Sequence, residues 1–335
     1  MSALLEVKNL YVDIPLAAGV LHAVRGVDFS VDRGQTLSLV GESGCGKSLS
    51  VLAVMNLLPK KAKWHADTIT FDGQNMGGIS EHQMANIRGS KMAMIFQEPM
   101  TALNPCYTIG NQLEEALLRH QPVSRDEARE RAVFLLEKVG ITAAGSRLKQ
   151  YPHQLSGGLR QRVMIAMGLM CDPPLIIADE PTTALDVTIQ AQILALLASL
   201  QKEFDMGMIL ITHDLGVVAR TTDHVAVMYC GQVVETGWAT ELFENPLHPY
   251  TQGLLRCIPV PGKTKPGEYL GSIPGMVPTP IGEQTGCVFQ NRCAYVFGDC
   301  TSAEVGFTRI SPGREYRCLL APEVCRKNMN ESQTT

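Results

Sequence analysis

A glycine-rich segment that joins a short apolar stretch to a helical one constrains the fold of this chain most. Residues 36–40 have the length and character of a buried strand, residues 41–48 read Gly-Glu-Ser-Gly-Cys-Gly-Lys-Ser, and residues 48–58 show a helical pattern that ends before Pro59. Glycines let successive backbone N–H groups face one anion, and the positive end of the following helix points at the same place. The order of strand, loop and helix therefore predicts an α/β fold whose loop binds nucleotide phosphates.

This phosphate-binding loop predicts a role for each of its side chains. Lys47 would reach the β- and γ-phosphates, and Ser48 would coordinate Mg²⁺. A thiol beside Lys47 and among phosphate-facing amides would have a lowered pKa, so we expect Cys45 to be reactive. The alternative is a glycine-rich turn that matches by chance, and the strand before it and the helix after it favour the nucleotide site. The backbone of the loop would form the cradle for the phosphates: Gly41, Glu42, Ser43, Gly44, Cys45, Gly46, Lys47 and Ser48.

A pair of carboxylates follows a second apolar stretch, at residues 175–178. In a parallel sheet, Asp179 at the end of this strand would lie beside the phosphate-binding loop and hold Mg²⁺ through water. The next residue, Glu180, could polarise the attacking water as a general base. An Asp-Glu pair alone is usually a solvated strand end, and only its partnership with the loop favours catalysis.

A second loop resembles an anion site at a helix start. Ser156, Gly157 and Gly158 precede a helical stretch that reaches Met170, and the N-terminus of a helix attracts phosphate. The alternative is an ordinary helix N-terminus that contains Ser and Gly and binds no phosphate, because it would have the same sequence pattern. A second phosphate site in one chain would be unusual for a simple nucleotide hydrolase.

The remaining pattern predicts a largely parallel sheet with ligands at the carboxyl ends of its strands. Residues 5–12 and 24–31 alternate between apolar and polar, as half-buried strands do, whereas residues 208–211 are continuously apolar. Ser124 begins a capping box before a helical stretch, and residues 189–200 form an amphipathic helix. From about Asn245 prolines and glycines accumulate, which indicates a loop-rich C-terminal extension.

Four further motifs carry a family resemblance. Residues 155–161 (Leu-Ser-Gly-Gly-Leu-Arg-Gln) look like the signature sequence of ABC transporter ATP-binding subunits, and Gln97 resembles the Q-loop residue of that family. Residues 183–186 resemble its D-loop, and His213 resembles its switch histidine. Together with the phosphate-binding loop and Asp179-Glu180, they follow the order and spacing of the family across roughly residues 5–245.

Three longer stretches narrow the resemblance to the ATPases of dipeptide and oligopeptide importers. They are residues 96–105 around Gln97, residues 180–188 starting at Glu180, and residues 248–252 (His-Pro-Tyr-Thr-Gln). The resemblance then extends to about Pro322. It implies an ABC-type ATPase domain at 1–245, with a RecA-like core, an antiparallel β subdomain and an α-helical subdomain at about 98–170. An importer-type extension would occupy 246–335.

The resemblance also implies a mechanism shared by two such subunits. They would face each other head to tail, with each ATP between the Lys47 loop of one and Ser156, Gly157 and Gly158 of the other. Glu180, His213 and Gln97 would be the catalytic residues, and Asp186 would contribute to the nucleotide site. Mg²⁺ would be held by Ser48, Gln97 and Asp179. The aromatic residue that stacks on adenine in the family has no clear counterpart among Tyr11, Ile14, Leu21 and His22, and Tyr11 fits a strand better.

Half of the ten cysteines crowd the last fifty residues. Four of them, Cys287, Cys293, Cys300 and Cys318, lack the close C-x-x-C pairs of common zinc modules, yet four thiolates could hold zinc or a [4Fe–4S] cluster. The resemblance implies that these cysteines hold a structural [4Fe–4S] cluster. The alternatives are a Zn²⁺ site and, third, free buried thiols that bind no metal. Cys325 is expected to take no part.

Composition limits the choice of partners. The net charge of −4 and the pI near 6.1 give no large electrostatic preference for nucleic acid. Charged residues occur too early in the sequence for the apolar region of a secretory signal. No apolar run approaches the ~20 residues that cross a bilayer. We therefore expect the chain to lie in a reducing compartment.

The resemblance places the chain peripherally at the cytoplasmic face of the inner (cell) membrane. Its partners would be a second, homologous ATPase, two transmembrane permease subunits and an extracytoplasmic substrate-binding protein. The cargo would be di- or oligopeptides, with nickel, glutathione or antimicrobial peptides as alternatives. A soluble non-transport ABC ATPase is a further reading, and so is a redox sensor built on the cysteines.

Overall fold

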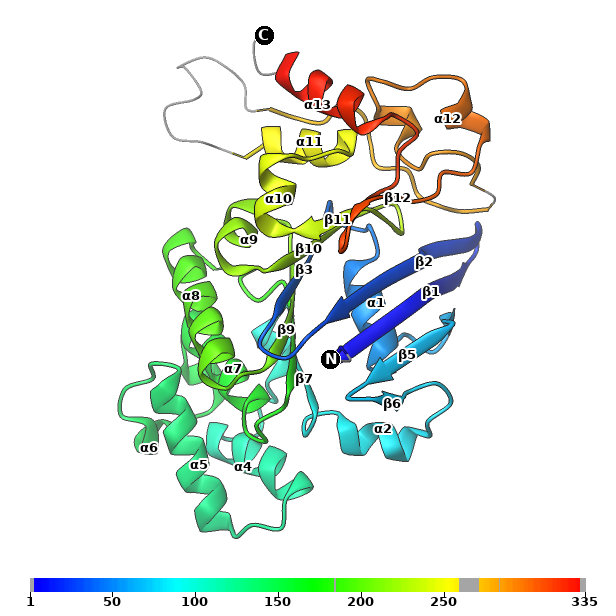
Figure 1. Ribbon diagram of the computed structural model, residues 1–335. Helices are drawn as coiled ribbons and strands as arrows, with labels where there is room; N and C mark the ends of the chain where they lie inside the picture. Colours follow the sequence, from blue (N-terminus) through cyan, green and yellow to red (C-terminus); the bar gives the residue numbers. More distant parts are fainter. Residues whose placement is uncertain (1–2, 184, 259–270, 283, 332–335) are drawn as a thin grey trace. The chain divides into compact units, whose positions relative to one another are not determined.

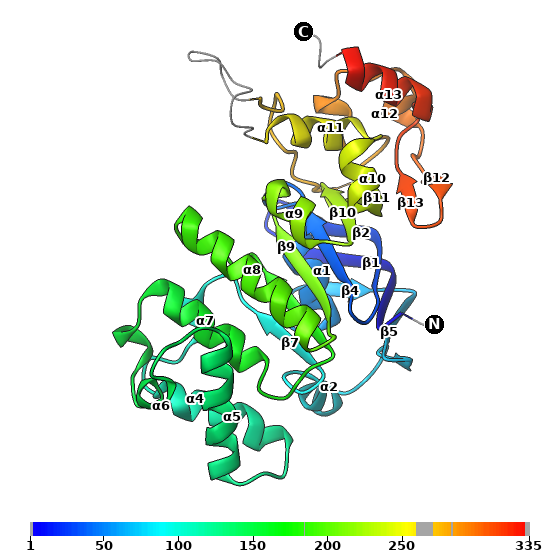
Figure 2. The ribbon, with the colours of Figure 1, turned by 60° about the vertical axis from the view of Figure 1, so that its left-hand side comes forward.

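The computed structural model describes residues 3–183, 185–258, 271–282 and 284–331 and is drawn in Figures 1 and 2. The chain forms two compact units, each assembled from separate stretches of sequence. The first unit comprises Met1–Leu4, Val31–Thr36 and Met76–Ile211. The second comprises Leu5–Ser30, Leu37–Asn75 and Thr212–Thr335.

The first unit contains parallel strands in the order β9-β8-β7. They are β7 (Met92–Ile95), β8 (Leu175–Asp179) and β9 (Gly207–Thr212), and every side chain in them is buried. Apolar residues on both faces are typical of parallel strands covered on both sides by helices. Asp179, which pairs with Ile211, ends β8, so its carboxylate lies at the carboxyl end of the strands as the sequence predicted.

Helices make up the rest of the first unit. Among them α4, α5 and α7 pack against one another, and the capping box predicted at Ser124 is present, with Glu127 as its second member. Figure 1 shows this group in green and cyan. The helices are α2 (Glu81–Ile87), α3 (Pro99–Ala102), α4 (Ile109–His120), α5 (Arg125–Lys138), α6 (Ala144–Arg147), the 3-10 turn η1 (Pro152–Gln154), α7 (Gly157–Gly168) and α8 (Val187–Glu203).

An antiparallel sheet opens the second unit, in the order β2-β1-β5-β6, with β4 also paired to β1. Alternate residues of β1 are buried, as the sequence pattern predicted. Tyr11 lies in β1 opposite His65 of β4, and their rings stack at 4.7 Å, so the assignment of Tyr11 to a strand is confirmed. The strands are β1 (Leu5–Leu16), β2 (Gly19–Val31), β4 (Lys63–His65), β5 (Thr68–Phe71) and β6 (Gln74–Asn75).

A second sheet of this unit joins the phosphate-binding region to the C-terminal extension, in the order β12-β13-β11-β10-β3. The strand β3 runs parallel to β10, and β10 forms an antiparallel hairpin with β11. The extension adds a further pair, because Glu235 of β11 pairs with Tyr316 of β13. The strands are β3 (Thr36–Val40), β10 (His224–Tyr229), β11 (Gln232–Trp238), β12 (Thr308–Ser311) and β13 (Arg314–Tyr316).

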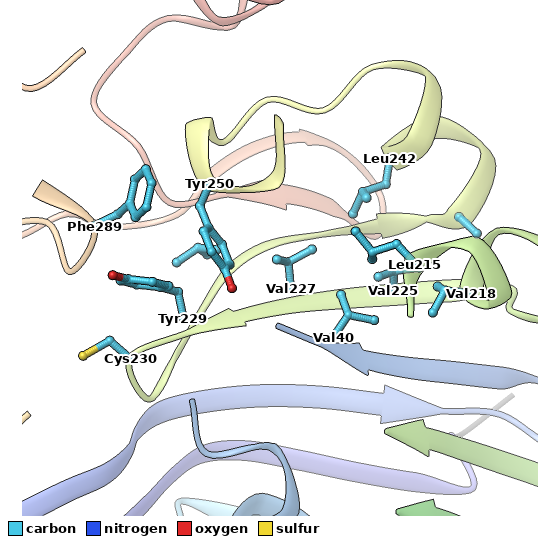
Figure 3. Packing of buried hydrophobic residues seen from close by; sticks show 12 residues of the cluster. Val40, Leu215, Val218, Val225, Val227, Tyr229, Cys230, Leu242, Tyr250 and Phe289 are labelled. Atoms are coloured by element: carbon cyan, nitrogen blue, oxygen red, sulfur yellow. The ribbon is translucent and has the colours of Figure 1, made fainter. Parts of the chain in front are cut away.

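One apolar cluster packs the extension onto this sheet (Figure 3). Val40 of β3 and Val227 of β10 share the cluster with Tyr250 of α11 and Phe289 of the extension. The rings of Tyr229 and Tyr250 are 4.6 Å apart, and Phe289 meets Tyr229 edge-on at 5.2 Å. The extension is therefore part of the same core as the strand that leads into the phosphate-binding loop.

The helices of the second unit are short. Nowhere in the described part of the chain is a helix both long and apolar enough to cross a membrane. They are α1 (Lys47–Val54), α9 (Leu215–Thr221), α10 (Ala239–Glu244), α11 (Pro249–Arg256), the 3-10 turn η2 (Gln290–Arg292), α12 (Asp299–Ser302) and α13 (Pro322–Glu331).

Candidate functional site

The phosphate-binding loop turns tightly between β3 and α1, and two of its glycines are required by space. Gly41 has a φ of 150°, and a Cβ there would lie 2.1 Å from the carbonyl oxygen of Met228. Gly46 has a φ of 100°, and a Cβ there would lie 2.4 Å from the carbonyl oxygen of Ala23. The loop is thus pressed against the backbone of β10 and β2, while Ser43 and Gly44 are exposed.

Lys47 begins α1 and is almost completely buried. Its ammonium donates hydrogen bonds to the carbonyl oxygens of Gly41 at 2.9 Å and Glu42 at 3.1 Å. Ser48 follows it in the first turn of the same helix and is partly exposed. A cation, a hydroxyl and a helix N-terminus therefore meet at one loop, which is the chemistry that binds phosphate.

The predicted lowering of the Cys45 pKa is wrong. Its side chain is buried, and its Sγ lies 3.6 Å from the Nζ of Lys47. Burial raises the pKa of the Cys45 thiol above its ordinary value, and the nearby charge of Lys47 opposes this rise without overcoming it. The thiol faces the protein interior, where it acts as a small apolar side chain.

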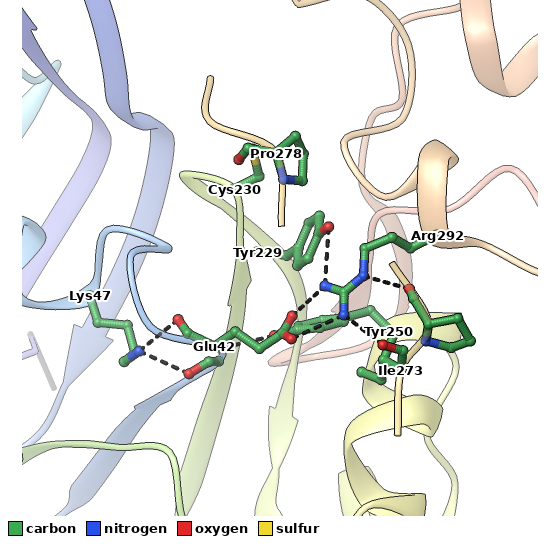
Figure 4. A network of polar contacts seen from close by, with 10 residues as sticks. Glu42, Lys47, Tyr229, Cys230, Tyr250, Ile273, Pro278 and Arg292 are labelled. Atoms are coloured by element: carbon green, nitrogen blue, oxygen red, sulfur yellow. Dashed lines mark hydrogen bonds and ion pairs between the residues drawn. The ribbon is translucent and has the colours of Figure 1, made fainter. Parts of the chain in front are cut away.

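Glu42 is held by two residues of the extension that the sequence analysis gave no role (Figure 4). Arg292 donates to both of its carboxylate oxygens, at 2.6 and 3.1 Å. The backbone N–H of Glu42 donates to the Oη of Tyr250 at 2.9 Å. Arg292 immediately precedes Cys293, and no motif marks it as a site residue.

His213 also lies in the second unit. It follows β9 and precedes Asp214, which caps α9 by accepting from the N–H groups of Gly216 and Val217. His213 lines a shallow pocket with residues of α9 and of the α11 end, among them Leu254. Its role as a switch residue stays a prediction.

The first unit brings together two of the predicted catalytic residues. The side-chain amide of Gln97 donates to the carboxylate of Glu180 at 2.9 Å, and the hydroxyl of Thr183 donates to the same oxygen at 2.9 Å. Glu180 has a φ of 44°, which is rare for a residue with a side chain and is typical of functional sites that store backbone strain. Asp179 beside it is buried. A carboxylate fixed by two donors at a strand end suits the positioning of a water molecule.

The second anion loop has the predicted helix start. Ser156 caps α7 by accepting from the N–H of Leu159, and Gly157 and Gly158 are the first helical residues. A Cβ at Gly158 would come within 3.2 Å of Ile189 in α8.

In the D-loop, Asp186 accepts from the N–H of Ile189 at 3.0 Å, so it caps α8. A Cβ at Gly157 would lie 3.7 Å from Leu185, so the D-loop lies beside the Ser156 loop. Ala184 of the D-loop lies outside the described residues.

The predicted nucleotide site draws on both units. Lys47, Ser48 and His213 belong to the second unit, and Gln97 and Glu180 belong to the first, as do Asp179, Ser156 and Asp186. Their joint action on one nucleotide stays a prediction.

The four clustered cysteines line one small cavity in the extension, together with Phe289 and His248. The backbone N–H of Cys287 donates to the carbonyl oxygen of Cys300 at 2.8 Å. In the described stretches, however, no three Cys, His, Asp or Glu side chains are placed to hold a common metal ion. The arrangement therefore does not fit the expected [4Fe–4S] cluster or zinc ion.

Cys325, to which the sequence analysis assigned no part, contacts this region. It is buried, and a hydrogen bond from its thiol lowers the pKa of Cys318 to about 7. The thiol of Cys325 is thus a hydrogen-bonding partner of Cys318.

Comparison with protein families gives two matches. Residues 24–183 match the ABC transporter family, and residues 234–300 match the C-terminal region of oligopeptide/dipeptide transporters.

Curated relatives match over nearly the whole chain. The dipeptide transport ATP-binding protein DppD of Escherichia coli (strain K12) is 48% identical over 94% of this chain and 96% of its own length. The oligopeptide transport ATP-binding protein AppD of Bacillus subtilis (strain 168) is 48% identical over 96% of this chain and 98% of its own length.

Solved structures share the fold of about 70% of the chain. A dimeric ATP-binding cassette in a post-hydrolysis state, bound to ADP and Pi, superposes with a TM-score of 0.63 at 26% identity. The match covers 70% of this chain and 98% of that one.

Proposed function

This chain belongs to the ABC transporter family, within the ATP-binding proteins of dipeptide and oligopeptide transporters, and we propose that it powers the import of peptides through membrane permease subunits. Both the family resemblance and the ABC-type α/β fold predicted from the sequence are confirmed. As a member of this family the chain is an ATPase, which converts ATP and water to ADP and phosphate.

The hydrogen bond between Gln97 and Glu180 carries the catalytic part of the proposal. A general base must hold the attacking water in a fixed direction, and Glu180 is itself fixed by Gln97 and Thr183. Glu180 would take a proton from the water as its oxygen attacks the γ-phosphorus, and the bond from that phosphorus to the β,γ-bridging oxygen would break. His213 would hold the γ-phosphate region in line with this attack.

The donors for Mg²⁺ suit that ion. Ser48, Asp179 and Gln97 offer hydroxyl, carboxylate and amide oxygens, which are the hard ligands that Mg²⁺ prefers. Asp179 is buried at the end of β8, where its carboxylate oxygens are of the kind that Mg²⁺ binds. Bound Mg²⁺ would neutralise charge on the phosphates, while Lys47 would bind their oxygens.

Two copies of this kind of chain would share each ATP. The N-terminus of α7, a helix of 12 residues, is capped by Ser156 and begins with two glycines, so it can approach an anion closely. The γ-phosphate would therefore lie between the Lys47 loop of one subunit and the Ser156 loop of the other, with Asp186 near the shared boundary. We propose that the second subunit is a homologous ATPase.

The remaining partners follow from the peptide-transport assignment. They are two transmembrane permeases and an extracytoplasmic substrate-binding protein, with this chain bound peripherally at the cytoplasmic face of the cell membrane. Cargo recognition would belong to those partners, so nickel, glutathione or antimicrobial peptides are the alternatives to test.

An iron–sulfur cluster forms no part of this proposal. The four cysteines line one cavity, but among the described residues no three Cys, His, Asp or Glu side chains are placed to hold one metal ion. Iron and sulfide analysis of anaerobically purified protein tests this directly. Stoichiometric iron and sulfide would show that the cysteines rearrange around a cluster.

Growth on peptides tests the transport function. In a strain that requires one amino acid, deletion of this chain should abolish growth on a dipeptide that contains it and preserve growth on the free amino acid. The wild-type chain should restore growth, and Glu180→Gln should not. Unchanged dipeptide uptake in the deletion strain, with loss of nickel or glutathione uptake instead, would reject peptide import and leave the ATPase assignment intact.

A further inference from the structure

An arginine of the C-terminal extension pairs with the second residue of the phosphate-binding loop, 250 positions earlier in the chain. Arg292 ends the 3-10 turn η2, and Glu42 follows Gly41. The two N–H···O bonds, at 2.6 and 3.1 Å, form the bidentate fork that arginine makes with a carboxylate (Figure 4). The Arg292 side chain is 3% exposed and that of Glu42 is 30% exposed, so the pair is largely shielded from water.

Arg292 is held in place by groups other than Glu42. Its Nε donates to the carbonyl oxygen of Pro274 at 2.9 Å, and its Nη2 donates to that of Ile273 at 3.0 Å. The guanidinium also lies 5.8 Å from the centre of the Tyr229 ring, a cation–π distance. These contacts fix the direction of the guanidinium, so its position does not depend on the carboxylate alone.

Glu42 in turn connects the extension to Lys47. Its N–H donates to the buried hydroxyl of Tyr250, and its carbonyl oxygen accepts from the Nζ of Lys47 at 3.1 Å. The backbone of Glu42 is thus bound on one side by α11 and on the other by the cation of the loop. Any shift of Glu42 would move the oxygen that Lys47 contacts.

The charge of Glu42 gives this contact a consequence for ATP. A carboxylate at the phosphate-binding loop would repel the phosphates of a nucleotide, because like charges in a partly shielded site interact strongly. A bidentate arginine cancels that charge and fixes the side chain that carries it. Lys47 and the α1 N-terminus are then the positive groups of the loop that would attract the phosphates.

We propose that Arg292 is a positioning residue for ATP binding, which neutralises Glu42 and holds the start of the phosphate-binding loop. This inference rests on the ATPase assignment and not on peptide import. Under this proposal the C-terminal extension contributes to ATP binding, because Arg292 and Tyr250, which both contact Glu42, lie beyond residue 245.

ATP affinity of the full-length chain and its variants tests the proposal. Arg292→Met should weaken ATP binding about tenfold at low salt, because an unpaired carboxylate then remains at the loop. The double variant Arg292→Met/Glu42→Gln should recover most of that loss, since the repelling charge is gone. Arg309→Met is the matched control: it removes an ion pair with Glu315 on the exposed β12–β13 hairpin and should bind ATP as the wild type does.

A comparison of ATP affinity among these variants shows whether Arg292 positions the phosphate-binding loop or only stabilises the fold. If the double variant binds ATP as weakly as Arg292→Met, or if Arg292→Met binds like the wild type, the proposal is rejected. If Arg292→Met does not fold, the ATP affinity of the single variant Glu42→Gln tests the proposal instead. This variant keeps hydrogen-bonding groups for Arg292 and should bind ATP at least as tightly as the wild type, and weaker binding would overturn the proposal.

Discussion

The side-chain amide of Gln97 donates a hydrogen bond to the carboxylate of Glu180 at 2.9 Å. Gln97 lies two residues beyond the end of β7, and Glu180 lies one residue beyond the end of the neighbouring strand β8. The parallel pairing of β7 and β8 therefore brings Gln97 to the carboxylate of Glu180, the proposed general base. A change in the position of Gln97 would be transmitted directly to the carboxylate.

Removal of this donor should slow hydrolysis more than it weakens binding. In Gln97→Ala, Glu180 keeps its bond from Thr183 but loses the bond from Gln97, so kcat should fall about 10- to 100-fold. The apparent affinity for ATP should change by less than about threefold. Steady-state phosphate release gives both values, and Gln284→Ala, an exposed glutamine of the extension, is the control. A variant with wild-type kcat would show that Gln97 does not position Glu180.

Two glycines of the phosphate-binding loop should respond differently to alanine. At Gly46 the new Cβ would meet the carbonyl oxygen of Ala23 at 2.4 Å, whereas at Gly44 it would have no neighbour within 4 Å. Both have a left-handed φ, of 100° and 80°, which costs about 1–2 kcal/mol for a residue with a side chain. Gly46→Ala should therefore lose about 2 kcal/mol more stability than Gly44→Ala, because only there must backbone move. Thermal unfolding of the two variants compares them, and equal midpoints would contradict the close approach.

Cys45 should be a slow target for alkylation. Burial raises the pKa of its thiol, so little thiolate forms near neutral pH. Cys106 is exposed and serves as the internal standard in the same molecule. Brief iodoacetamide treatment at pH 7.5, followed by peptide mass spectrometry, should label Cys45 at least about tenfold more slowly than Cys106. Equal labelling rates for Cys45 and Cys106 would instead support the reactive Cys45 thiol that was expected from the sequence.

His248 should make the protein less stable in acid. Burial and the nearby charge of Arg317 lower the pKa of His248 from 6.5 to about 3, so the folded state keeps the ring neutral. The unfolded chain binds a proton below its ordinary pKa of 6.5, so this group destabilises the fold increasingly as the pH falls from about 6.5 towards 3.

A substitution at this position isolates the effect. His248→Asn preserves a cap for the N–H of Tyr250 and removes the titration. The wild type should lose stability more steeply than the variant, by up to about 1.4 kcal/mol per pH unit. Parallel pH profiles of the unfolding midpoint would show that His248 is not buried in its neutral form.

Local patterns predicted much of the secondary structure that carries the candidate site. The buried strands at 175–178 and 208–211, the capping box at Ser124 and the helix start at Ser156 depend on neighbouring residues, and all of them are present. The reactivity of Cys45 could not be predicted, because the direction of its side chain depends on how Gly41 packs against β10.

The features that local patterns did not predict depend on contacts between residues far apart in the sequence. The strand β12 has one apolar residue in four, Ile310, so no alternation distinguishes it from a loop. It forms because β13 pairs with the edge of β11. Arg292 and Glu42 are 250 positions apart in the sequence, and the core that contains Tyr250 and Phe289 connects their parts of the chain.

The central claim is that Glu180 drives ATP hydrolysis at the site built on the Lys47 loop. The most direct measurement is the hydrolysis rate of purified Glu180→Gln, alongside its equilibrium binding of ATP. Because the glutamine keeps the shape and the bonds from Gln97 and Thr183 but cannot accept the proton, kcat should fall about 10²- to 10⁴-fold with ATP binding preserved. Hydrolysis at the wild-type rate in this variant would contradict the account.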